Sequence, residues 1–154
     1  MGDVELDLER TIDAPIEDVF ARLVDVDGYD AWMPRKGSIR RGSRQTSTGP
    51  PAVGTTFVDD TVFGPTPGEI VELRAPDTVL FHWWDDSRSG TRHAEGWPGY
   101  ALERVDDQTT LLRHHARMRT YRHYRPATPV LRRIALRERA TTVDALAASF
   151  RAPA

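Results

Sequence analysis

The chain has 154 residues and a formal net charge of −2, and this length is usual for one domain. It contains no cysteine, which excludes disulfide bridges, thiolate zinc sites and cysteine nucleophiles. Its apolar runs are too short to span a bilayer as a helix, and its first residues lack the pattern of a signal peptide. We therefore expect one cytoplasmic domain over 1–154, with an ordered core at about 4–150.

Charge is unevenly distributed along the chain. Residues 1–31 carry ten acidic and two basic groups, whereas residues 113–139 carry nine arginines and one glutamate. Alone, the second segment is compatible with a nucleic-acid-binding face. The alternative, which the strand pattern favours, is that the two segments lie side by side and their charges pair. With a net charge near zero, we expect no nucleic-acid partner.

The first forty residues predict one strand and two short helices. Residues 4–12 alternate with a period of two, which is typical of a half-buried strand. Pro15 marks the beginning of a helix, because proline is favoured in a first helical turn. Apolar residues then recur at helical spacing over 16–24, and a second short helix is expected near Tyr29 and Trp32.

The middle of the chain predicts six strands with short connections. Glycine- and proline-rich breaks, including one at 64–67, separate segments of period two. Short connections join antiparallel neighbours, so a meander is expected. A long helix over about 129–150 ends the pattern, with Arg132 and Arg139 in the same sector as its apolar stripe. The expected strands are 37–43, 55–63, 68–75, 78–85, 92–105 and 109–122.

This order of elements resembles a known superfamily. Ile12-Asp13-Ala14-Pro15-Ile16-Glu17-Asp18-Val19-Phe20 is followed twelve residues on by Trp32-Met33-Pro34, and Gly68-Glu69-Ile70-Val71-Glu72-Leu73 is followed by Pro76, Leu80 and Trp84. Over about 4–150 the chain resembles the START-like or SRPBCC superfamily, also called "polyketide cyclase/dehydrase and lipid transport". The resemblance implies an α+β helix-grip fold: a curved antiparallel seven-stranded sheet around a long C-terminal helix, with two short helices after the first strand.

The resemblance also implies a deep apolar cavity between sheet and helix. The family pattern turns Leu80, His82 and Trp84 inward. The intervening residues would then lie on the convex face, where their apolar surface suits a homodimer contact; these are Val79, Phe81 and Trp83. The candidate ligand-binding residues are Trp32, Met33, Phe57, Asp59, Phe63, His82, Trp84, Trp97, Tyr100, His114, Met118, Arg132 and Arg139.

Two histidines of this set carry the chemical hypotheses. Burial disfavours a charged imidazole, so His82 and His114 would be neutral near pH 7, each able to donate and to accept one hydrogen bond. That state suits general acid–base catalysis on a carbonyl or enol, and it equally suits a polar anchor for a ligand. His93 or Asp59 would be needed as a third zinc ligand, but no ligand-spacing motif is present, so we expect no metal. No nucleotide-binding glycine motif is present either, and no cofactor is expected.

Arg132 and Arg139 need an anion if either reaches the cavity, because arginine stays charged. A ligand with an apolar body and an acidic head would satisfy them; alternatively, their stems cover apolar surface while their heads reach water. The leading functional hypothesis is binding or transport of a small hydrophobic or amphipathic molecule, without membrane insertion. The alternatives are a cofactor-free polyketide-type cyclase or dehydratase using His82 or His114, and a protein-interaction module. Fold resemblance does not choose among them.

Overall fold

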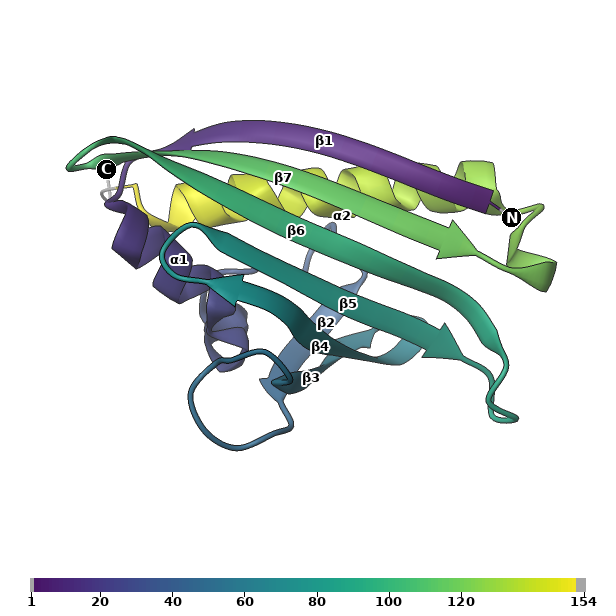
Figure 1. Cartoon of the computed structure of the whole chain (residues 1–154). Helices are drawn as coiled ribbons and strands as arrows, with labels where there is room; N and C mark the ends of the chain where they lie inside the picture. Colours follow the sequence, from purple (N-terminus) through teal and green to yellow (C-terminus); the bar gives the residue numbers. More distant parts are fainter. Residues whose placement is uncertain (1, 152–154) are drawn as a thin grey trace.

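The computed structural model describes residues 2–151 (Figure 1). Seven antiparallel strands form one sheet in the order β1-β7-β6-β5-β4-β3-β2, and a long helix lies along one face of it. This architecture confirms the expected α+β helix-grip fold. The strands are β1 (Gly2–Ile12), β2 (Arg40–Gln45), β3 (Thr56–Thr61), β4 (Gly64–Arg74), β5 (Thr78–Asp86), β6 (Arg92–Asp106) and β7 (Thr109–Thr120). The helices are α1 (Ile16–Val24), the 3-10 helices η1 (Val26–Ala31) and η2 (Arg122–Tyr124), and α2 (Thr128–Ser149).

One expected turn is wrong. The segment 64–67 was predicted to separate two strands, but it begins β4. The chain reverses just before it, and Gly64 adopts a φ of 112°, which glycine tolerates without steric cost. Pro65 and Pro67 are accepted there because β4 pairs with β5 only from Gly68 onward, so the missing N–H groups break no bond to that neighbour.

The predicted pairing of the acidic first strand with the basic last strand is confirmed. β1 and β7 are neighbours, with Asp3 opposite Arg119 and Glu9 opposite Arg113. The Asp3 and Arg119 side chains approach to 3.0 Å and those of Glu9 and Arg113 to 3.3 Å. These pairs lie on the outer face of the sheet, where they fix the strand register more than they add stability.

The hydrophobic core lies between the inner face of the sheet and the helices. Val143, Leu146 and Ala147 of α2 are buried in it, together with the apolar stripe of α1. Figure 1 shows α2 running along the sheet behind β1 and β7, with α1 near its C-terminal end. A second buried cluster, including Met118, packs against Leu131 near the start of α2.

The predicted orientation of β5 is wrong. Val79 and Phe81 are buried in the core, and Trp83 packs on the second cluster beneath α2. Leu80, His82 and Trp84 therefore occupy the outer face, and the proposed dimer contact loses its apolar residues. Nearly every position from 79 to 84 is apolar or aromatic, so the alternation that normally distinguishes the two faces is missing.

No helix within residues 2–151 is long and apolar enough to cross a membrane.

Candidate functional site

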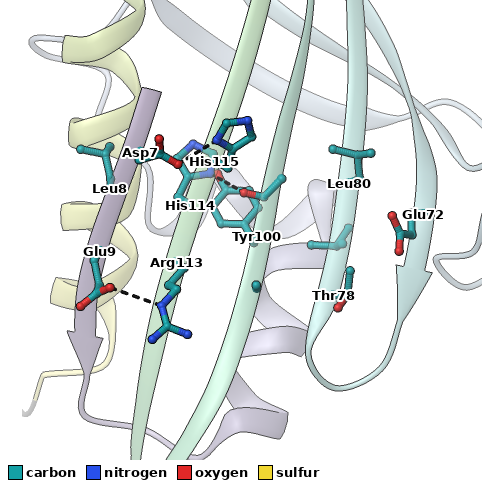
Figure 2. A pocket seen from close by; sticks show the side chains of 13 residues that line it. Asp7, Leu8, Glu9, Glu72, Thr78, Leu80, Tyr100, Arg113, His114 and His115 are labelled. Atoms are coloured by element: carbon teal, nitrogen blue, oxygen red, sulfur yellow. Dashed lines mark hydrogen bonds and ion pairs between the residues drawn. The ribbon is translucent and has the colours of Figure 1, made fainter. Parts of the chain in front are cut away.

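The inner face of the sheet holds a buried histidine with one unused nitrogen. His114 lies on β7, is 1% exposed, and stacks on Tyr100 of β6 with ring centroids 4.2 Å apart. Its Nδ1 lies 2.7 Å from the Gly99 carbonyl oxygen. A carbonyl only accepts, so Nδ1 carries the proton and Nε2 keeps its lone pair. Figure 2 draws that bond. Within the described part of the chain, Nε2 is buried and has no hydrogen-bond partner.

The environment keeps this imidazole neutral. Burial, followed by the nearby charge of Arg139, lowers the pKa of His114 to about 3. At neutral pH the ring therefore presents a fixed acceptor to the interior. The same low pKa makes Nε2 a weak general base, because proton transfer to it is unfavourable near pH 7.

The charge of Arg139 on α2 affects several buried polar groups. We call His114, Tyr29, Tyr100 and Asp59 the interior set. Burial raises the pKa of Tyr29 well above its usual value, and it also raises the pKa of Tyr100. Burial raises the pKa of Asp59 too, although a hydrogen bond from Ser43 and the charge of Arg139 oppose the rise. The charge of Arg139 lowers the pKa of each of these groups and of His114, so this one cation influences the whole interior set.

Two hydrogen-bond donors near this set are also unused. The Trp32 Nε1 and Arg40 Nη1 groups are buried without a partner among residues 2–151. The remaining nitrogens of Arg40 are engaged: Nε donates to Ser43 Oγ at 2.8 Å, and Nη2 pairs with Asp30. Ser43 in turn donates to Asp59 Oδ1 at 2.6 Å. Buried polar groups are rarely left unpaired. The acceptor His114 Nε2 and the donors Trp32 Nε1 and Arg40 Nη1 therefore remain available for hydrogen bonds to a ligand.

The structure divides the predicted ligand-binding residues between the two sides of the sheet. Eight lie on the inner side of the sheet, in α2 or just after η1: Trp32, Met33, Phe57, Asp59, Tyr100, His114, Met118 and Arg139. The other five do not line the interior. Phe63 is in the β3–β4 turn and 74% exposed, Arg132 is exposed on α2, and His82, Trp84 and Trp97 are on the outer face.

His82 and His114 consequently do not face a common volume, and the predicted histidine pair is wrong. His82 Nε2 lies 2.8 Å from Glu95 Oε1, and the ring stacks on Trp97. Glu95, 9% exposed, also accepts from Tyr121 Oη at 2.6 Å and from Arg92 Nη1 at 3.4 Å. Burial alone would raise the pKa of Glu95, but these hydrogen bonds and nearby positive charge lower it. The outer histidine thus belongs to a hydrogen-bonded network centred on Glu95.

Two surface hollows border these regions. One, of about 1160 Å³, lies between α1, η1 and the end of α2, and Trp32 forms part of its wall. The Trp32 ring also meets Tyr29 edge-on at 5.0 Å, which connects this hollow to the interior set. The other, of about 530 Å³, lies over β1, β7, β6 and β5 near Gly99 and is bordered by charged residues such as Asp7 and Arg113 (Figure 2).

The sequence analysis missed Tyr29 of the interior set, and it missed Arg40 and Ser43 next to that set. Tyr29 was detectable, because it precedes Trp32 by three residues in a short helical segment, and that spacing puts both on one side. Arg40 and Ser43 gave no such signal. They lie in a polar stretch whose strand has no apolar alternation, and only the three-dimensional structure connects them to Asp59.

Comparison with solved structures places this architecture among START-like proteins. The Zhui aromatase/cyclase from Streptomyces sp. R1128 superposes with a TM-score of 0.77 at 13% identity, covering 96% of this chain and 93% of that one. A START superfamily protein from Mycobacterium smegmatis gives 0.70 at 12% identity, covering 95% and 96%. A norcoclaurine synthase point mutant from Thalictrum flavum gives 0.72 at 10% identity, covering 96% and 94%. No family model and no curated protein sequence matches the chain.

The chain therefore has the START-like fold that the sequence predicted.

Proposed function

We propose that the protein binds a small, largely apolar molecule that carries oxygen functions, between the sheet and α2. The observation that carries this proposal is the unused Nε2 of His114 in a buried, neutral imidazole. A ligand hydroxyl would donate to it. Phe57, Phe81 and Tyr100, whose rings meet edge to face, supply apolar walls for the ligand body.

Arg139 and the two unused donors suit the other end of such a ligand. Arg139 makes no ion pair among the described residues, and Trp32 Nε1 and Arg40 Nη1 are free. A carboxylate, phenolate or carbonyl oxygen would accept from them. The preferred ligand is thus amphipathic, with a hydroxyl directed to His114 and an acidic or carbonyl group directed to Arg139.

The route of entry in this proposal is the hollow between α1, η1 and α2. Trp32 lines that hollow, and its ring contacts the ring of Tyr29. In this proposal, movement of the Trp32 side chain is the local rearrangement that admits the ligand.

The test combines native mass spectrometry with a binding assay. Mass spectrometry of the purified protein looks for a retained small molecule, and titration uses 6-hydroxy-2-naphthoic acid, an aromatic probe with one hydroxyl and one carboxylate. Arg139→Gln loses a hydrogen bond to a charged group and should bind the probe roughly tenfold more weakly. His114→Phe loses a hydrogen bond to a neutral imidazole and should bind it several-fold more weakly.

Arg132→Gln is the matched control, since Arg132 is seven residues away on the same helix but exposed. It should bind the probe like the wild type. Equal affinity in the wild type, Arg139→Gln and His114→Phe would refute the proposal, as would an absence of probe binding with no retained molecule.

The second candidate is a cofactor-free polyketide-type cyclase or dehydratase. It is supported by His114, whose tautomer leaves Nε2 directed to the interior, and by the similarity to aromatase/cyclase structures. Nε2 would take a proton from the carbon beside a substrate carbonyl. A base whose pKa is about 3 predicts a rate that does not change with pH above about pH 4. Conversion of a 1,3-diketone probe that disappears in His114→Gln would favour this enzyme over a carrier.

A further inference from the structure

Only part of the basic C-terminal segment is neutralised by the acidic first strand. The outward arginines of β7 find partners in β1 or, for Arg117, stack over the Trp97 ring at 4.4 Å. No aspartate or glutamate occurs between Asp107 and Glu138, and Glu138 is buried, accepting hydrogen bonds from Ser38 and the backbone of residue 39. The arginines from Arg122 to Arg133 therefore have no acidic neighbour in the sequence, and the acidic neighbour of Arg137 is already engaged.

These arginines lie at η2 and along the first half of α2, and the loop before β2 adds further basic residues. The members are exposed, and none makes an ion pair within 4 Å among residues 2–151. The Arg137 guanidinium lies 3.8 Å from the Cβ position of Gly37, so the loop adjoins α2. We call this set the basic surface: Arg35, Lys36, Arg122, Arg125, Arg132, Arg133 and Arg137.

The basic surface also presents two exposed aliphatic side chains. Val130 is 62% exposed and Leu136 is 45% exposed. Val130, Arg133 and Arg137 follow one side of α2 at helical spacing, and Arg132 and Leu136 follow the adjacent side. The amino end of α2 adds the positive end of its helix dipole. Cations thus surround isolated apolar groups on the outward side of one helix.

From this arrangement we propose that the protein docks on anionic lipid bilayers through the basic surface, with the first half of α2 lying in the membrane interface. The arginines attract anionic headgroups, and the two exposed aliphatic side chains beside them can enter the headgroup region of a bilayer. A nucleic acid would use the arginines but gain nothing from Val130 and Leu136, since its affinity comes mainly from phosphate contacts. The chain's overall charge of −2 means that the attraction must be local.

The experiment is co-sedimentation with vesicles of phosphatidylcholine alone or with 30% phosphatidylglycerol, at low and high salt. Wild-type protein should bind only the anionic vesicles, and high salt should release most of it. Each basic residue near an anionic surface contributes roughly fivefold to binding. The variant Arg132→Glu/Arg133→Glu/Arg137→Glu should therefore lose at least about 100-fold in affinity.

The matched control reverses three exposed arginines on other elements, Arg44→Glu/Arg74→Glu/Arg88→Glu, and so changes the net charge equally. It should bind vesicles within a few-fold of the wild type. Circular dichroism verifies that both variants fold. The proposal would be overturned if the wild-type protein did not bind anionic vesicles. It would also be overturned if the control lost as much vesicle affinity as the basic-surface variant.

A second variant distinguishes a lipid surface from other polyanions. Val130→Ser/Leu136→Ser should weaken vesicle binding several-fold and leave binding to heparin unchanged, because only the bilayer accepts the aliphatic groups. Tighter binding to a DNA duplex or to poly-glutamate than to vesicles, at equal salt, would refute the lipid assignment. The probe titration above contains no vesicles, so the ligand-binding proposal and the docking proposal fail independently.

Discussion

The two faces of the sheet treat histidine in opposite ways. On the inner face, His114 is buried against Tyr100, and one ring nitrogen has no partner within the described residues. On the outer face, His82 meets a carboxylate, and that carboxylate is already bonded to Tyr121 and Arg92. A buried polar group without a hydrogen-bond partner is costly, so the unpaired Nε2 of His114 calls for a functional explanation. The hydrogen bonds around His82 are explained by their structural role alone.

The largest expected effect is a pH dependence caused by His114. Its folded-state pKa of about 3 lies below the usual value near 6.5, so the unfolded chain binds an extra proton between these pH values. The part of the unfolding free energy that depends on neutral His114 is therefore fully present above pH 6.5. It is lost as the pH falls toward 3, at up to about 1.4 kcal/mol per pH unit. Urea unfolding of the wild type and of His114→Gln, at intervals from pH 7 to pH 4, measures this slope.

The matched control for that measurement is His115→Gln, which changes the exposed neighbour on the opposite face of β7. We expect it to keep most of the wild-type slope, whereas His114→Gln removes the portion assigned to the buried ring. Identical slopes in the wild type and His114→Gln would mean that His114 is not held neutral by burial.

A smaller effect is expected from the outer network. Glu95→Gln removes the charge that three donors share, and loss of one partner in a buried charged network destabilises by roughly 2–3 kcal/mol. Urea unfolding at pH 7 measures the change. Glu103→Gln, an exposed glutamate paired with Arg113, should change stability by less than about 0.5 kcal/mol. Similar costs for the two variants would show that burial does not make the Glu95 network more stabilising than an exposed pair.

The sequence predicted the order of elements because turn residues and periodicity are local signals. The strand at 4–12, the helix beginning after Pro15 and the final helix are each defined by their own residues. The pairing of β1 with β7 was predictable as well, since acidic and basic residues alternate outward on both strands. The fold thus follows from local patterns together with one long-range complementarity of charge.

The site was less predictable because it depends on faces and on distant contacts. The run from Val79 to Trp84 gave no reliable alternation, so the face of β5 was assigned from the family pattern and was reversed. Arg132 shows the same problem on α2, where helical spacing placed it with the apolar stripe but it is exposed. His114 was placed correctly because polar residues clearly separate the two sides of β7.

The smallest expected effect concerns the exposed end of the same outer face. Asp3 and Arg119 pair at 3.0 Å between β1 and β7, with Asp3 about half exposed. Side-chain entropy and solvent screening oppose such a pair, so a double-mutant cycle with Asp3→Asn and Arg119→Gln should give a coupling of about 0.5 kcal/mol. Repeating the unfolding in 1 M NaCl should reduce it further. Asp3 is about half exposed, whereas Glu95 is buried. A coupling between Asp3 and Arg119 as large as the destabilisation by Glu95→Gln would therefore contradict the view that charge pairs on this face stabilise the fold only when buried.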